Sequence, residues 1–429
     1  MNQEELKREE TNTEQTESGG EVQTLWTKNF TIITLGTAVS MFGSVLAGFA
    51  TGLLVLDFTG SVFLFAIYMI LFDVPKVLMP QIIGPILDKF SRRKMIYTLD
   101  FMSAGIYGIF GLILLKGDIG FVPLAIGCAL LGIINSIYTV AYDSFYPMLV
   151  TEGNMGKAYS ISSTMESLLM IVTPLSAYLY HKIGIAPLFF INCATYFIAA
   201  VFETQIRIKE EYVIEKGEKF GISQYVETFK EGIEYLRLEP GLMAVALYFM
   251  FSSFSGGANM IVGLPYFRDT YGIKGEYIFM IVGGSMMLGR LMAGAYHYKF
   301  KIKPERKFSI AFVVYISIAV LGGAYLFTPV PCMVAMCFAS GVLGMTSYNI
   351  RISSTQNYVP HEKKGRFNGT FQMLSTLGML SGEFLSGVMA DYMDKRMVVL
   401  LFAVVEFSAA WLFMYRKRKN VSEIYNRET

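Results

Sequence analysis

The sequence is poor in charged residues and in cysteine. Only 16% of its 429 residues are charged and 53% are apolar, whereas about a quarter of a soluble domain is charged. The four cysteines are scattered through apolar runs without a CxxC pair, which excludes a disulfide framework and a zinc finger. The net charge of +2 gives no general attraction to nucleic acid. A soluble enzyme and a nucleic-acid-binding protein are therefore both disfavoured.

The sequence also lacks the common motifs of catalysis. It contains no GxxxxGK(S/T), GxSxG or HExxH, and whole apolar segments separate His181, His297 and His361. We therefore expect no enzyme activity, no ATP-driven transport, no metal and no cofactor. Residues 1–28 lack the basic and apolar regions of a signal peptide, and we predict that they form a disordered cytosolic tail.

Long apolar segments fill the rest of the chain. Each is close to the ~20 residues that a helix needs to cross ~30 Å of hydrocarbon. We predict an all-α membrane protein with twelve transmembrane helices, at residues 30–56, 62–84, 95–115, 121–146, 159–180, 185–205, 242–267, 276–297, 308–328, 331–354, 367–390 and 397–415.

Lysine and arginine predict the orientation of these helices. Of the 36 basic residues, 27 fall on the side of the two termini, 6 fall on the other side, and Lys76, Arg290 and Arg351 lie within spans. Because basic loops stay in the cytosol, we expect both termini there. The expected location is the plasma membrane, and a bacterial inner membrane in particular.

The two halves of the chain repeat one another. Gly84 and Gly294 are 210 residues apart, and Gly156-Lys157 resembles Gly365-Arg366 at an offset of 209. We predict two parallel six-helix halves, residues 29–206 and 241–416, with a substrate site between them near the middle of the membrane.

A linker and a tail complete the predicted organisation. Within linker residues 207–240, one helical face carries Tyr225, Phe229, Ile233 and Leu236, which indicates an amphipathic helix on the cytosolic surface. Residues 417–429 are predicted to be a basic cytosolic tail.

One motif resembles a family signature. The segment after the second span follows the pattern Gly-x-x-x-Asp-(Arg/Lys)-x-Gly-(Arg/Lys)-(Arg/Lys) of the major facilitator superfamily, with Ser91 in place of its second glycine. The residues that carry the match are Gly84, Asp88, Lys89, Arg92 and Arg93. The turn Thr59-Gly60-Ser61 and the segments 232–237 and 359–366 resemble the macrolide-efflux and siderophore-exporter branch.

The resemblance implies a function. Such a protein has the twelve-helix major facilitator fold, is expected to be monomeric, and works by rocking its halves about a central site. We expect a secondary active transporter that exports lipophilic or amphipathic, antibiotic-like small molecules and is driven by the proton gradient.

Charges inside the spans point to candidate coupling residues, because each costs at least ~2.5–3.5 kcal/mol at mid-bilayer. Asp73 and Lys76 share one helical face. They form either a self-neutralising pair that stabilises packing or a switch in which protonation of Asp73 frees Lys76. Glu166 is a candidate proton carrier or substrate-cation site. Asp143 is either an interfacial cap or gate residue or a third coupling site.

A second group of residues is a candidate for substrate binding: Lys76, Asn135, Asn259, Arg290, Asn349 and Arg351. We expect Arg290 and Arg351 to pair with the acids across the cavity. Phe249, Phe251, Met260 and Met345 are candidates for an apolar wall. For Glu383 and Glu406 we expect local packing beside a polar partner.

Two other functions are considered. An uptake or uniport carrier for a small metabolite would use directional polar groups instead of an apolar wall. A membrane sensor or membrane enzyme would need an extra domain, for which the 28-residue tail and the linker are too short.

Overall fold

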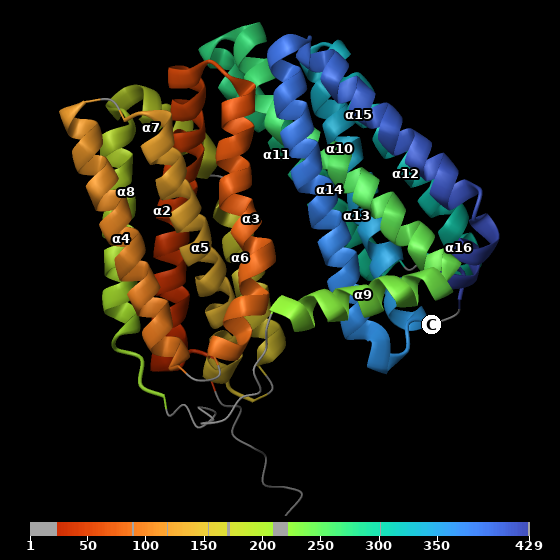
Figure 1. Ribbon diagram of the computed structural model, residues 1–429, viewed down its shortest axis with the longest axis horizontal. Coiled ribbons are helices and arrows are strands. Elements are labelled where there is room, and N and C mark those ends of the chain that lie inside the picture. The colour runs from red at the N-terminus through yellow and green to blue at the C-terminus, as the bar shows by residue number, and fades with distance from the viewer. Residues whose placement is uncertain are drawn as a thin grey trace, which may run out of the picture.

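The described part of the computed structural model is entirely helical in its regular structure. It comprises residues 24–87, 90–117, 119–152, 154–169, 172–208, 222–300 and 302–427. The long helices run side by side in two groups, with the N-terminal half of the chain in one and the C-terminal half in the other (Figure 1). The predicted all-α class is confirmed.

The described part of the N-terminal half contains seven α-helices and a short 3-10 helix at Tyr146–Leu149. The α-helices are α2 (Lys28–Thr59), α3 (Val62–Leu87), α4 (Arg92–Lys116), α5 (Phe121–Phe145), α6 (Met155–Leu169), α7 (Val172–Ile183) and α8 (Ile185–Glu203).

The C-terminal half begins after the linker helix α9 (Ile222–Leu238). Its helices are α10 (Pro240–Tyr271), α11 (Ile273–Lys299), α12 (Lys307–Ala324), α13 (Val330–Tyr358), α14 (Lys364–Tyr392), α15 (Lys395–Ala409) and α16 (Arg418–Tyr425). A π-helical turn, Ala410–Tyr415, continues α15.

Ten of the described helical segments are long and apolar enough to cross a membrane. The other two predicted spans correspond to α3 and to the pair α6 and α7, and residues 170–171 between that pair lie outside the described part of the chain. The arrangement is consistent with twelve spans. The linker helix α9 lies where the apolar periodicity predicts a helix.

Equivalent helices pack in equivalent ways in the two halves. The pairs α3–α5 and α2–α8 of the first half correspond to α11–α13 and α10–α15 of the second. Gly132 on α5 and Gly341 on α13, which are 209 residues apart, both lie at such contacts. A Cβ atom at Gly132 would lie 2.8 Å from the carbonyl oxygen of Phe72 on α3. A Cβ atom at Gly341 would overlap the carbonyl oxygen of Met286 on α11. Small residues thus bring the backbones close, as in other membrane bundles.

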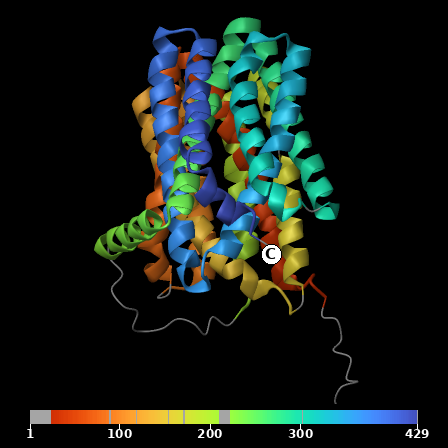
Figure 2. The ribbon, with the colours of Figure 1, turned by 90° about the vertical axis from the view of Figure 1, so that its right-hand side faces the viewer.

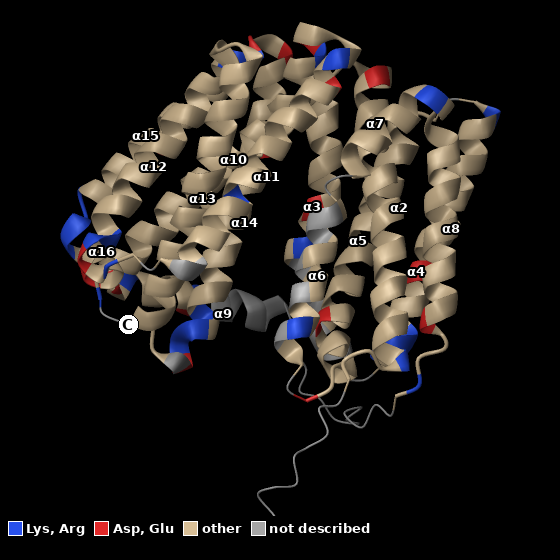
Figure 3. Ribbon diagram, turned by 180° about the vertical axis from the view of Figure 1, so that it is seen from behind, with Lys and Arg blue, Asp and Glu red and all other residues tan. Residues whose placement is uncertain are grey.

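The two ends of the bundle differ in how the halves meet. We call the end with the α2–α3 and α10–α11 turns the outer end, and the end with α9 and α16 the inner end. The halves lean together at the outer end and diverge toward the inner end, where α9 extends between them (Figure 1). Figure 2 shows α9 at the same end of the bundle as the C-terminus. Charged residues gather at both ends, and only a few lie between (Figure 3).

Local signals set several helix ends. Thr27 caps α2 by accepting a hydrogen bond from the Phe30 N–H at 3.2 Å. Gly60 ends α2 with a φ of 63°, a left-handed conformation that glycine adopts without strain. Ser91, which departs from the family pattern, caps α4 by accepting from the Lys94 N–H at 3.2 Å.

The segment after the last span belongs to the core of the C-terminal half. Val421, Ile424 and Tyr425 of α16 are buried. The hydroxyl groups of Tyr425 and Tyr315 on α12 are 2.8 Å apart. The helix therefore docks under α12 within the residues predicted as a basic tail.

Candidate functional site

A charged pair lies on α3 beside the second half. Lys76 Nζ donates to Asp73 Oδ1 at 2.6 Å and stands 4.6 Å from the centre of the Phe72 ring. The Asp73 side chain is 12% exposed and that of Lys76 is 46% exposed. The two predicted residues therefore interact with each other, one turn apart, with Lys76 on the accessible side.

Helix α5 supports α3 at this pair. Pro75 has no N–H, so the Leu71 carbonyl, four residues earlier in α3, lacks its usual intrahelical donor. The Ser136 hydroxyl donates to the Pro75 carbonyl at 3.0 Å, and Gly132 lets α5 approach the same turn. The position of the charged pair is thus held from the side of α5.

Glu383 on α14 is a third member of this charged group. It is fully buried and lies within electrostatic range of Asp73 and Lys76. A Cβ at Gly257 of α10 would lie 3.2 Å from its Cγ. Neither carboxylate oxygen has a hydrogen-bond partner among the described residues. Glu383, Asp73 and Lys76 form what we call the central cluster, which spans the contact between α3 of one half and α14 of the other.

The two glutamates expected to pack locally behave differently. Glu406 has the expected polar partner, because the Ser252 hydroxyl donates to it at 2.7 Å. Glu383 has none in the part of the chain that the structure describes. The expectation of local packing beside a polar partner is therefore wrong for Glu383, because α14 turns it toward the charges of α3.

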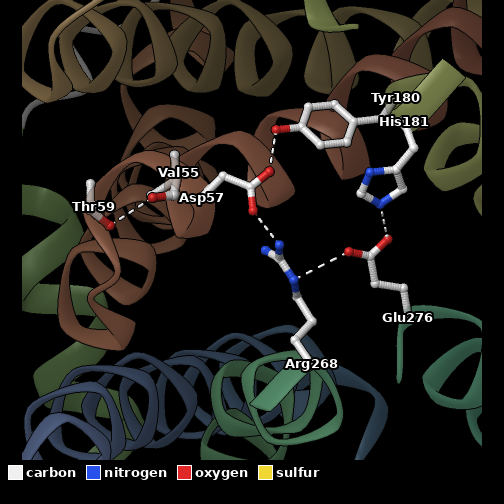
Figure 4. A network of polar contacts seen from close by, with 7 residues as sticks. All are labelled: Val55, Asp57, Thr59, Tyr180, His181, Arg268 and Glu276. Atoms are coloured by element: carbon white, nitrogen blue, oxygen red, sulfur yellow. Dashed lines mark hydrogen bonds and ion pairs between the residues drawn. The ribbon is translucent and has the colours of Figure 1, made fainter. Parts of the chain in front are cut away.

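A second group of charges joins the halves at the outer end (Figure 4). Arg268 on α10 contacts Asp57 on α2, and its Nε lies 3.2 Å from Glu276 Oε1 on α11. His181 Nε2 on α7 lies 2.7 Å from Glu276 Oε2, and the neighbouring Tyr180 hydroxyl donates to Asp57 at 2.5 Å. We call these five residues the outer network. It links α2 and α7 of the first half to α10 and α11 of the second.

The outer end has one more link between the halves. Asp391, near the end of α14, accepts from the Ser61 hydroxyl at 2.6 Å and from the Val62 N–H at 2.7 Å. A carboxylate of the second half thus caps the N-terminus of α3 in the first, where the helix dipole favours negative charge. Beside it, hydrogen bonds from Arg396 lower the pKa of Asp394 to about 2, so this cap of α15 stays ionised.

Arg351 on α13 is surrounded by aromatic rings. Its guanidinium carbon lies 5.1 Å from the Phe249 ring centre, 4.5 Å from that of Phe371 and 5.5 Å from that of Tyr348. Its Nε is buried and has no hydrogen-bond partner among the described residues. The expected pairing with an acid is not seen for Arg351 or for the exposed Arg290 within the described chain. The cation is instead held by three π faces.

The three asparagines predicted to bind substrate do not converge. Asn135 lines a cavity of about 210 Å³ inside the N-terminal half. Asn349 lines a cavity of about 770 Å³ at the inner end of the C-terminal half, together with His297 and Lys303. Asn259 donates to the Ser255 carbonyl of its own helix at 3.1 Å. The fold therefore does not bring the three asparagines together in a single site.

The basic residues of the family motif hold the inner end of the N-terminal half. Arg92 donates to the Ser144 carbonyl at 3.0 Å and Arg93 to the Ile206 carbonyl at 2.5 Å. Asp143 is exposed near the same end of α5. Asp88, Lys89 and the side chain of Glu166 lie outside the described residues, and so do the surroundings of Gly84.

The sequence contained an unused signal for two further buried acids outside the central cluster and the outer network. Asp100 on α4 and Glu203 on α8 are buried acids within predicted spans, so the reasoning that selected Asp73 applied to them equally. The outer network has no such signal, because isolated charges at the ends of spans are ordinary. Only the fold brings Asp57 and Arg268 together.

Comparisons with known proteins agree with this architecture. The family model of the Major Facilitator Superfamily matches residues 33–383. An uncharacterized MFS-type transporter, YkuC of Bacillus subtilis (strain 168), is 24% identical over 409 residues, which cover 89% of this chain and 92% of that protein. Macrolide efflux protein A of Streptococcus pyogenes is 22% identical over 380 residues, which cover 85% and 90%.

Solved structures share the fold. The nucleoside transporter NupG aligns with a TM-score of 0.62 at 14% identity, over 90% of this chain and 98% of that one. A bacterial homologue of the iron transporter ferroportin, in its outward-facing state, aligns with a TM-score of 0.59 at 15% identity, over 92% and 99%. With its apolar helices and two equivalent halves, the chain belongs to the Major Facilitator Superfamily and is a multi-pass membrane transporter, not an enzyme.

Proposed function

We propose that this transporter exports amphipathic small molecules by alternating access and that protons drive the cycle. The observation that carries the proposal is the central cluster, which places two acids and one base at a contact between the halves. The distant macrolide efflux relative supports the direction and the substrate class. The excess of Lys and Arg on the side of the two termini supports a plasma-membrane location with cytosolic termini. The family favours a monomer.

Charge balance in the central cluster supports proton coupling. Asp73 and Lys76 neutralise one another, so an ionised Glu383 leaves one uncompensated negative charge in a buried site. Such a charge is costly in low dielectric, and one added proton removes it. Because α3 and α14 must move past one another when the halves rock, the cost of ionised Glu383 depends on the state of the carrier.

Arg351 and its rings support an amphipathic substrate. A ligand that stacks on Phe249 and Phe371 gains apolar and aromatic contact. The unpartnered Nε of Arg351 then offers a hydrogen bond to an acceptor on the same molecule. A ligand with an apolar face and one acceptor fits this arrangement best.

The outer network supports the assignment of this structure to the inward-facing state. Asp57–Arg268 and His181–Glu276 both cross between the halves, so both contacts must break before the outer end opens. Glu166 and Asp143 remain candidate proton sites on the sequence grounds given above.

The second candidate function is uptake of a small metabolite. The structural likeness to a nucleoside transporter favours it, since a base could stack where we place the amphipathic compound. This candidate needs no exchange of substrate for incoming protons and predicts a preference for a hydrogen-bonding solute.

Transport into proteoliposomes tests both candidates. The purified protein is reconstituted, and uptake of radiolabelled erythromycin and uridine is measured with and without an imposed pH gradient. We expect gradient-driven erythromycin accumulation that is lost in Glu383→Gln and in Asp73→Asn. Glu406→Gln is the matched control, because it removes a buried acid that has its own partner, Ser252.

The outcomes separate the proposals. Erythromycin transport that ignores the gradient refutes proton coupling. Uridine transport without erythromycin transport refutes export of amphipathic compounds in favour of uptake. Normal coupling in Glu383→Gln refutes the assigned role of the central cluster while leaving the transporter assignment intact.

A further inference from the structure

A second buried acidic group lies entirely inside the N-terminal half. Asp100 on α4 is 1% exposed and Glu203, the last residue of α8, is fully buried. The two carboxyl groups lie beside each other, and the Tyr138 hydroxyl of α5 lies beside Glu203. Helices α4 and α8 pack against each other along this contact. The group is separate from the central cluster and takes no part in the contact between the halves.

The polar atoms of this group lack close partners. Among the described residues, no close, well-aligned hydrogen bond reaches Oδ2 of Asp100, either carboxylate oxygen of Glu203, the Tyr138 hydroxyl or the Thr37 hydroxyl of α2, and these groups interact with one another at longer range. Thr37 is only 6% exposed. Buried polar atoms nearly always have a partner, and a bound ligand would satisfy all five of these atoms.

The fold leaves room for that ligand. Thr37, Asp100 and Tyr138 line the cavity of about 210 Å³ between α2, α4, α5 and α8, which is large enough for several water molecules. Gly36 on α2 faces the Glu203 carboxylate, and a Cβ there would lie 3.5 Å from Oε1. The Glu203 carboxylate therefore lies against the helix that also presents the Thr37 hydroxyl.

The charge of the group identifies the ligand class. Each carboxyl is acted on by the other and by no basic side chain of the described residues. Two adjacent carboxylates without a cation are strongly unfavourable in a protein interior. All the available donors are oxygens, which hard cations such as Ca²⁺ and Mg²⁺ prefer.

We infer that Thr37, Asp100, Tyr138 and Glu203 form a binding site for a hard divalent cation. The two carboxylates neutralise the ion, the two hydroxyl groups add neutral oxygen ligands, and water in the adjacent cavity completes the shell. The ion joins α2, α4, α5 and α8, one ligand from each, and so fixes the N-terminal half as a rigid unit. The site needs neither the transported substrate nor the coupling ion of the proposed function.

Metal binding to the purified full-length protein tests this inference. After treatment with a chelator, the protein is titrated with calcium chloride and separately with magnesium chloride, and thermal stability and binding of radioactive calcium are measured. We expect a metal-dependent rise in Tm. We also expect affinity at least about tenfold weaker in Asp100→Asn and in Glu203→Gln, a lower limit for loss of a direct ligand. Glu406→Gln, a buried acid of the other half, is the matched control and should bind as the unaltered protein does.

Tyr138→Phe keeps the test decisive if the carboxyl variants fail to fold. It removes one ligand and no charge. Terbium, a luminescent substitute for calcium, should bind this variant more weakly, and the terbium emission sensitised by Tyr138 should fall. The inference is overturned if neither metal shifts Tm in the unaltered protein, which would leave a shared proton as the neutralising species. It is also overturned if Asp100→Asn, Glu203→Gln and Tyr138→Phe bind metal as tightly as Glu406→Gln.

Discussion

Replacing Arg268 tests how the outer end is kept closed. Arg268 contacts Asp57 in the other half and Glu276 in its own half. When the halves separate, the contact with Glu276 persists, because α10 and α11 move together. Of the two contacts that Arg268 makes, only the one with Asp57 is lost when the outer end opens. Arg268→Ala should therefore shift the carrier toward an open outer end.

The expected size of the shift follows from the burial of the pair. The Arg268 side chain is 21% exposed and that of Asp57 is 35% exposed. Exposed ion pairs contribute about 0–1 kcal/mol, and hydrogen bonds to charged groups about 1.5–3 kcal/mol. A half-buried pair lies between these ranges, at about 1–2 kcal/mol, which corresponds to a roughly 5-fold to 30-fold change in the ratio of the two states.

Distance measurements by electron paramagnetic resonance can detect this change. Spin labels at Lys182 in the last turn of α7 and at Lys274 in α11 report on the outer end, since both residues are exposed and lie in different halves. The native cysteines are first replaced. We expect the Arg268→Ala protein to gain a population with a longer distance between these labels.

Lys395→Ala is the matched control. Lys395 pairs with Asp269 at 2.5 Å, also at the outer end, but α15 and α10 both belong to the C-terminal half. It should leave the label distance unchanged. If Arg268→Ala has no effect, or if Lys395→Ala changes the distance as much, the outer network does not hold the halves together.

Three further predictions concern stability and binding. Asp391→Ala removes the cap of α3 and should lower the free energy of unfolding by about 0.5–2 kcal/mol, measured as a lower Tm in detergent. Gly341→Ala should lower the Tm, because the added methyl group would overlap the Met286 carbonyl oxygen. Gly344→Ala is the control, because its methyl group would meet nothing within 4 Å, and equal melting temperatures of the two variants would contradict the close contact of α11 and α13. Arg351→Lys should weaken substrate binding because an ammonium cannot stack on three rings, and unchanged affinity in a binding titration would remove Arg351 from the substrate site.

Much of the fold can be predicted from sequence because a bilayer dictates the length of each helix. The expected segment 62–84 is part of α3 (Val62–Leu87), and 121–146 is nearly the same as α5 (Phe121–Phe145). The segment 159–180 overlaps α6 (Met155–Leu169) and α7 (Val172–Ile183), the described helices on either side of residues 170–171.

The site is only partly predictable, because side-chain partners depend on how helices are rotated. Spacing along one helix was enough to pair Asp73 with Lys76. It could not indicate that α14 presents Glu383 to that pair, or that Arg351 lies among rings contributed by α10 and α14. The residues of the outer network come from four helices in two halves, and no local pattern relates them.

The docking of α16 has a consequence for biogenesis. The elements of the N-terminal half are all present once residue 206 has been synthesised, so this half can pack while the rest of the chain is still being made. The core of the C-terminal half is still incomplete when the last membrane helix has been synthesised. Two contacts of α12 require residues beyond that helix: the Tyr315 hydroxyl contacts that of Tyr425, and the Phe308 N–H donates to the Asn426 side chain at 3.0 Å. Its final packing must therefore follow insertion, and a protein tag placed directly after residue 416 would interfere with assembly instead of merely extending the chain.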